Sequence, residues 1–128
     1  MGYGISKTST LPYEQAIERV TEELKKEGFG ILTTIDVRDT LKKKLNIDFD
    51  KYVILGACNP PFAHKVLEAE NQAGLLLPCN VIVYEKAGST VVAAFDPLSM
   101  TKLLENERIL PVADEVGRRL RRVIDAMP

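Results

Sequence analysis

The residues best suited to chemistry are the two cysteines, Cys58 and Cys79, and the single histidine, His64. Cys58 ends one expected strand, Cys79 begins another, and His64 lies in the first turns of the helix expected after Cys58. Two thiolates and an imidazole are ligands that Zn²⁺ accepts, with a water or a carboxylate as the fourth. The spacing does not match compact zinc modules, in which paired ligands lie about two to four residues apart. The competing interpretation is two small buried hydrophobic side chains and a surface histidine.

Redox chemistry is a second interpretation of the cysteines. Cys58 directly precedes a helix N-terminus, whose dipole stabilises a thiolate. A disulfide between Cys58 and Cys79 requires Cα atoms within about 7 Å of each other. The sequence does not fix that distance.

A third interpretation is a small-molecule site at the same strand ends. Asn59 follows Cys58 and Asn80 follows Cys79, so each strand end pairs a thiol with an amide. Small-molecule sites are concave and apolar, with a few polar groups at the rim. Small residues that could leave such room beside the sheet interrupt the bulky strands: Gly56, Ala57, Ala93 and Ala94. The competing structural roles are that Asn59 caps its helix, that Asn80 bonds an adjacent turn, and that the small residues admit a close-packed helix.

Signals for catalysis are weak. Ser99 and Thr101 have no evident partner base, and no acidic residue flanks His64 to orient it. The glycines form neither a Gly-x-Gly-x-x-Gly pattern nor a phosphate loop. We therefore expect a small-molecule-binding or sensing module and no enzyme. A thiol- or metal-dependent enzyme using the same cysteines is one alternative, and a structural dimer without a ligand is another.

The elements that position these residues follow from apolar periodicity. Alternating or continuous apolar runs predict strands over residues 3–7, 29–36, 52–58, 79–86 and 89–95. Helical spacing predicts a long helix capped by Thr10 and ended by Gly28, a short helix over 37–45, a helix from 60 to about 71, and a final helix over 109–127. A late hairpin without a regular strand–helix rhythm favours the α+β class. We expect a mainly antiparallel sheet of about five strands with a long N-terminal and a long C-terminal helix packed on it.

Several strands are apolar on both faces, at residues 52–58, 81–84 and 91–95, although a one-sided antiparallel sheet would alternate. The short helices and the apolar 75–77 connector are expected to cover part of the second face. A ligand or a second copy of the chain would cover the rest, so we expect a homodimer. The length predicts a single domain over residues 1–128, since a domain has about 150 residues.

Composition narrows the setting. The chain is 45% hydrophobic and 27% charged, with a net charge of −1, which excludes a disordered polar chain and disfavours a nucleic-acid binder. No apolar run approaches the ~18 residues of a membrane span. Two cysteines in a chain of this size favour a reducing compartment. We expect a cytoplasmic protein with neither nucleic acid nor membrane as partner.

Three stretches carry a resemblance to a known family: Gly56-Ala57-Cys58-Asn59-Pro60-Pro61, Leu75-Leu76-Leu77-Pro78-Cys79-Asn80-Val81, and Asp96-Pro97 with Met100. In this order, and with Ile35-Asp36-Val37, they resemble the bacterial and archaeal DUF302 family of unknown function over about residues 3–100. The resemblance implies a strand, a helix, further antiparallel strands and a long final helix. That layout is similar to the TATA-binding-protein-like or helix-grip architecture. The resemblance supplies no activity.

Overall fold

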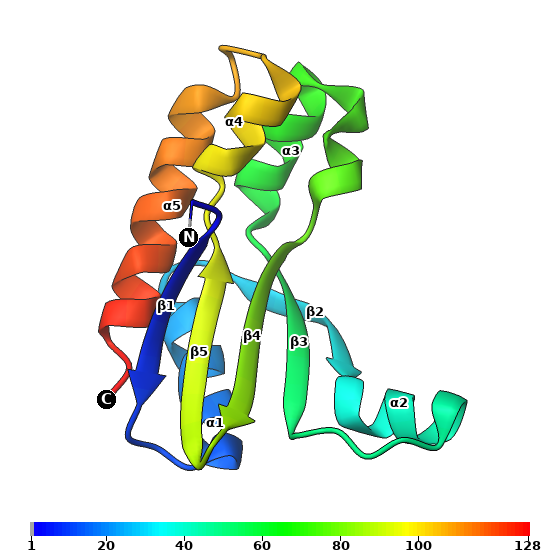
Figure 1. The fold of residues 1–128 in the computed structure, drawn as a ribbon. Coiled ribbons are helices and arrows are strands. Elements are labelled where there is room, and N and C mark those ends of the chain that lie inside the picture. Colours follow the sequence, from blue (N-terminus) through cyan, green and yellow to red (C-terminus); the bar gives the residue numbers. More distant parts are fainter. Residues whose placement is uncertain (1) are drawn as a thin grey trace.

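A five-stranded antiparallel sheet forms the centre of the structure, a computed structural model that describes residues 2–128 (Figure 1). The spatial order is β1-β5-β4-β3-β2, and every neighbouring pair is antiparallel. The α+β class and the antiparallel sheet are therefore confirmed. The strands are β1 (Gly4–Ser9), β2 (Gly30–Asp36), β3 (Tyr52–Cys58), β4 (Cys79–Lys86) and β5 (Ser89–Phe95).

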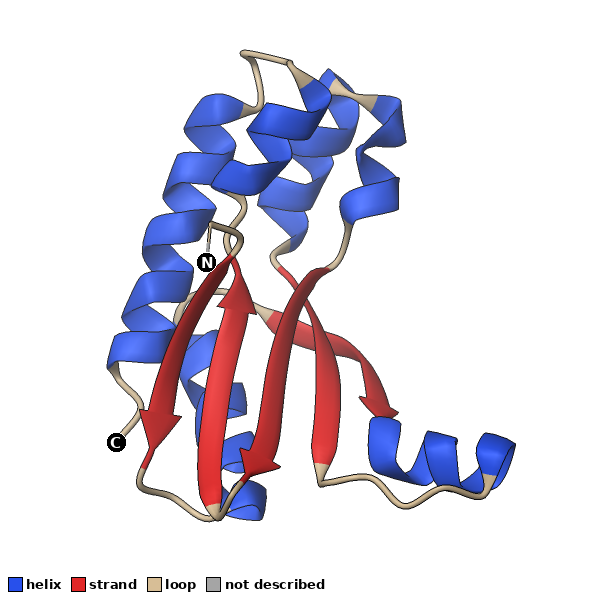
Figure 2. Cartoon of the chain, viewed as in Figure 1, coloured by secondary structure: helices blue, strands red, loops and turns tan. Residues whose placement is uncertain are grey.

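The helices fall into three groups (Figure 2). The long helices α1 (Tyr13–Lys26) and α5 (Leu110–Asp125) pack on one face of the sheet. The short helices α3 (Pro60–Ala69) and α4 (Leu98–Leu104) and the 3₁₀ helix η1 (Asn71–Leu76) gather beyond one end of it. α2 (Val37–Leu45) follows β2 and projects to the side. Helix α4 was not predicted, because its seven residues carry a single buried side chain, Met100.

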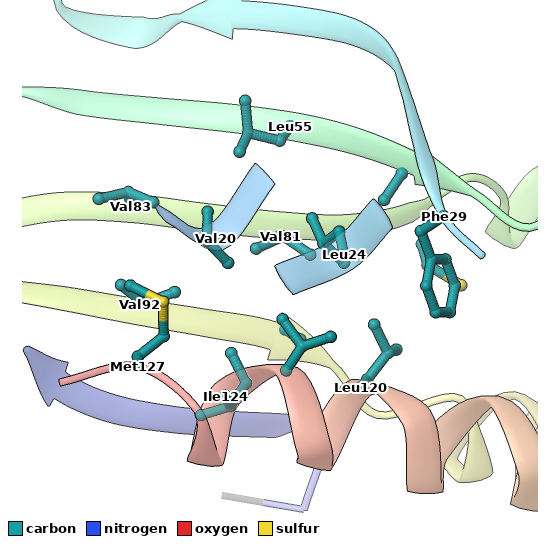
Figure 3. Packing of buried hydrophobic residues seen from close by; sticks show 14 of the residues in the cluster. Val20, Leu24, Phe29, Leu55, Val81, Val83, Val92, Leu120, Ile124 and Met127 are labelled. Atoms are coloured by element: carbon teal, nitrogen blue, oxygen red, sulfur yellow. The ribbon is translucent and has the colours of Figure 1, made fainter. Parts of the chain in front are cut away.

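The main core lies between the sheet and the two long helices (Figure 3). Val20 and Leu24 of α1 meet Val81 of β4 and Leu120 of α5 in one buried cluster. The apolar spacing of the first and last helices is confirmed by this burial. A smaller cluster joins α3, η1, α4 and α5 beyond the sheet end: Val66, Ala73, Met100, Ile109 and Ala113.

Of the two predicted ends of α1, the C-terminal one is confirmed and the N-terminal one is wrong. Thr10 does not cap this helix: α1 begins after Pro12, which has no side chain able to cap it. The amide of Thr10 instead donates to the Pro128 carbonyl, so the turn before α1 is tied to the chain's C-terminus. Gly28 does occupy the left-handed position after the helix, with φ of +87°.

β2 does not alternate as predicted. The register against β3 shifts between Ile31 and Thr33, so one extra residue, Leu32, is accommodated at this irregularity and is 66% exposed. Ile35 farther along the strand is also exposed. The predicted alternating face of Phe29, Ile31, Thr33 and Ile35 is therefore interrupted: Phe29 and Ile31 pack against the core, and the shift turns Ile35 to the other face.

The second face of the sheet has no helix over it within residues 2–128 (Figure 2). The short helices that were expected to cover part of it lie beyond the sheet end instead. Residues 75–77 also lie beyond this end of the sheet, and Leu75 is 82% exposed. None of the helices described is both long and apolar enough to cross a bilayer.

Replacing Leu120 tests the core assignment. Leu120 is fully buried against the sheet, so Leu120→Ala is expected to lower the free energy of unfolding by about 2–5 kcal/mol, measured by urea denaturation. Leu75→Ala is the matched control at an exposed site and is expected to change stability by less than about 0.5 kcal/mol. Equal losses in the two variants would contradict the packing described.

Candidate functional site

A cavity of about 320 Å³ lies where the sheet end meets α3, α4 and α5. Ala57, Cys58 and Cys79 form its sheet side, and Phe62 and Val116 are among the helical residues around it. Leu32 and Leu67, both exposed, mark its solvent-facing rim. Among the described residues that line the cavity, Asn59 has the one polar side chain other than the two thiols. The cavity is thus an almost wholly apolar space with a single amide.

The strand pairing brings the two cysteines to this place. Ala57 is paired with Cys79 in the antiparallel β3–β4 ladder, so Cys58 lies one residue beyond that pair. Both cysteines are free thiols, Cys79 buried and Cys58 partly buried. The separation that the sequence left open is therefore short, because β3 and β4 are antiparallel neighbours.

The Cys79 thiol has low reactivity at this position. Burial, with a smaller contribution from nearby Cys58, raises the pKa of the Cys79 thiol from 9.0 to about 11. A thiol with so high a pKa stays protonated at neutral pH, and the thiolate is the form that attacks electrophiles and binds metals. Cys79 therefore contributes a neutral, weakly polar wall.

Asn59 occupies the first position before α3, yet its side chain does not cap that helix. Its Nδ2 donates instead to the Glu27 carbonyl, at 3.3 Å, and the residue is only 7% exposed. Gly28 allows this approach, since a Cβ there would lie 2.9 Å from Nδ2. The helix-capping role considered for Asn59 is therefore wrong: Oδ1 accepts no hydrogen bond from the first turn of α3, and Nδ2 binds a carbonyl distant in sequence.

A charged network holds the helices around the cavity from outside. The Arg119 guanidinium donates to the Glu27 carbonyl at 3.0 Å and to the Glu115 carboxylate at 2.9 Å. It also lies over the Phe62 ring, 4.9 Å from the centroid. Arg122 pairs with the Glu27 carboxylate at 2.8 Å and, mainly through that hydrogen bond, holds the pKa of Glu27 below its usual range. These contacts connect the end of α1 to α5 and position Phe62, while the charges stay out of the cavity lining.

Asn80 and His64 lie away from the cavity. Asn80 is exposed on the open face of the sheet, because successive side chains of a strand point to opposite faces. It borders a second, more polar depression of about 470 Å³ that also includes Tyr52, Ile82 and Tyr84. His64 is on the solvent side of α3, where its side chain is 74% exposed and Nε2 is 3.0 Å from Glu68.

The zinc hypothesis depended on Cys58, Cys79 and His64 coming together. The structure places His64 on the exposed side of α3 and Cys79 in the interior. Within the part of the chain that the structure describes, no three His, Cys, Asp or Glu side chains are grouped so that they could hold a metal ion. The residues present therefore do not form the predicted zinc ligand set.

The small residues have different roles. A Cβ at Gly56 would collide with Thr33 Oγ1 and lie 3.0 Å from Pro78, so Gly56 is required for close packing and leaves no empty space. Ala57 does line the cavity. Met100 and Phe62 line the cavity but were not among the predicted site residues, since a pattern of apolar residues does not show which of them border a void.

Comparisons with known proteins agree with this fold. The family model described as "Domain of unknown function DUF302" matches residues 5–127, including the final helix. A crystal structure of an uncharacterized conserved DUF302 protein from Bacillus stearothermophilus is similar to this chain, with 30% sequence identity and a TM-score of 0.91 over 98% of both chains. No curated protein matches the chain. The resemblance noted in the sequence is thereby confirmed, and the chain belongs to the DUF302 family.

Proposed function

We propose that this protein is a binding or sensing module for a small, neutral, largely apolar molecule, which it holds in the cavity beside Cys58, Asn59 and Cys79. The observation that carries the proposal is the apolar cavity of about 320 Å³. This volume lies at the lower end of the ~300–1,000 Å³ typical of small-molecule sites. The proposed site does not include Asn80 or His64, which lie elsewhere on the surface.

The chemistry of the lining supports a neutral ligand. No charged side chain of residues 2–128 lines the cavity. Bringing an ionised group into an apolar space without a partner carries a large free-energy penalty. We place the protein in the reducing cytoplasm, where both thiols stay free.

Binding at the cavity also offers a route to sensing. The walls come from β3, β4, α3, α4 and α5, so one ligand would contact both the sheet and the helices beyond its end. A ligand that binds the folded state and not the unfolded state stabilises the folded state by an amount that rises with the logarithm of ligand concentration above Kd. Occupancy would therefore strengthen the contact between these two parts of the fold.

Filling the cavity is the direct test, with p-xylene as the probe. At ten times its dissociation constant, p-xylene is expected to stabilise the wild-type protein by about 1.4 kcal/mol and raise Tm by about 3–6 °C in calorimetry. Ala63→Phe places a ring in the cavity, because Ala63 lines it, and is expected to abolish this shift. His64→Phe is the control, since the neighbouring His64 faces solvent, and it is expected to retain the shift. If the wild-type protein shows no shift with p-xylene or with more polar aromatic probes, the proposal is wrong.

The thiol-dependent enzyme is the alternative, and thiol reactivity separates it from binding. Raising the pKa of Cys79 from 9.0 to about 11 reduces its thiolate fraction at neutral pH about a hundredfold. Alkylation of folded Cys58→Ser at neutral pH is therefore expected to be slow, with a rate that keeps rising as the pH approaches about 11. Alkylation of the same variant in denaturant, where Cys79 is exposed, is the control. Rapid alkylation of the folded variant at neutral pH would favour thiol chemistry at Cys79.

A second candidate function is self-association through the open face of the sheet. This face carries Ile82, Phe95 and the stacked rings of Tyr52 and Tyr84, whose centroids are 5.3 Å apart. Contiguous apolar surface of this kind is characteristic of interaction sites. A second copy of the chain is the occupant we propose, because the same face on two copies can pair around a twofold axis.

Sedimentation equilibrium tests the homodimer. The wild-type protein is expected to sediment at twice the chain mass of 14.2 kDa at micromolar concentration. Ile82→Glu puts a charge in the centre of the open face and is expected to give the monomer mass. Leu103→Glu, at an exposed site on α4, is the control and is expected to leave the dimer intact. A monomeric wild-type protein would exclude the dimer without affecting the cavity proposal.

A further inference from the structure

We propose that Asn59 is the polar anchor of the cavity and that its ligand carries one hydrogen-bond donor, a hydroxyl or an N–H group, on an otherwise apolar body. The inference rests on the proposed binding function and specifies its ligand class. The donor group would bind Asn59 Oδ1, and the apolar body would fill the space between the sheet end and the helices.

The orientation of the Asn59 amide follows from its partner. The Glu27 carbonyl can only accept a hydrogen bond, so Nδ2 must face it. Oδ1 is then directed away from Glu27. Gly28 encloses the Nδ2 side, because even a methyl group at Gly28 would meet Nδ2.

Oδ1 has no hydrogen-bond partner among residues 2–128: the side chain makes no capping bond to α3, and its one hydrogen bond is made through Nδ2. Every side-chain nitrogen or oxygen of these residues that is sealed from solvent does have a partner. Oδ1 is therefore accessible to solvent, although Asn59 as a whole is only 7% exposed. The open space that Asn59 borders is the cavity.

One free acceptor in an apolar lining sets the chemistry of the ligand. An apolar ligand would leave Oδ1 without water and without a partner, which disfavours its binding. A ligand with several polar groups would leave most of them unpaired, since the remaining walls are apolar side chains and two thiols. A ligand with a single donor satisfies Oδ1 and leaves no polar group of its own unpaired.

A pair of probes of equal shape isolates this contact. p-Cresol and p-xylene differ by a hydroxyl in place of a methyl group, and both are measured by isothermal titration calorimetry against wild-type protein and Asn59→Leu. Leucine keeps the approximate shape and removes the acceptor. The Glu27 carbonyl retains its bond from Arg119 in this variant, so no buried acceptor is orphaned there.

The expected result is a change in the ratio of the two dissociation constants. Wild-type protein is expected to bind p-cresol at least as tightly as p-xylene, and Asn59→Leu is expected to weaken p-cresol relative to p-xylene about tenfold. An unchanged ratio, with both probes bound, would overturn the role of Asn59 and leave the proposed cavity function standing. Binding of neither probe by wild-type protein would overturn both.

A second measurement needs no substitution and covers the case in which Asn59→Leu does not fold. In the wild-type complex with p-cresol, nuclear Overhauser contacts are expected between the Asn59 Hδ2 protons and the ring protons beside the hydroxyl. The p-cresol methyl group is expected to contact the apolar walls. The reversed orientation, with the methyl group beside Asn59, would overturn the inference.

Discussion

The antiparallel pairing of Ala57 with Cys79 determines what the sheet end presents to the helices. It places the end of β3 beside the start of β4, and it directs Cys79 to the face covered by helices. The alternation of strand side chains then sends Asn80 to the opposite face. A shift of this register by one residue would exchange Cys79 and Asn80 and line the cavity with a second amide. The nearly apolar character of the site therefore depends on this register.

The Glu27 backbone carbonyl is the second point on which the site depends. It accepts from Asn59 and from Arg119 and so connects the end of α1 to the start of α3 and to α5. Arg119 and Arg122 are both engaged with acidic partners in this region. The positive charges of α5 are thus used in helix packing, which keeps them out of the cavity lining. An apolar cavity can form next to a highly charged helix for this reason.

Much of the fold could be predicted from local pattern. The predicted ranges of β3, β4, β5 and α2 coincide with the observed ones, because apolar runs, turn residues and prolines mark both ends of each element. The predictions for β2 and for residues 75–77 were wrong where burial depends on distant neighbours. The irregularity at Leu32 changes which side chains face the core. In residues 75–77, Leu76 and Leu77 pack against the smaller cluster beyond the sheet end, whereas Leu75 is exposed. Neither outcome has a signal in the sequence nearby.

The sequence by itself determined that Cys58 ends one strand, that Cys79 begins another and that each is followed by an amide, since strand ends and residue order are local properties. Only the tertiary structure decided that Asn59 lines the cavity while Asn80 and His64 face solvent. Those directions depend on strand register, on the solvent-facing side of α3, and on a carbonyl 32 residues away that accepts from Asn59. Residue order alone is compatible with several directions for each of these side chains. Long-range hydrogen bonds and packing determine which direction each one takes.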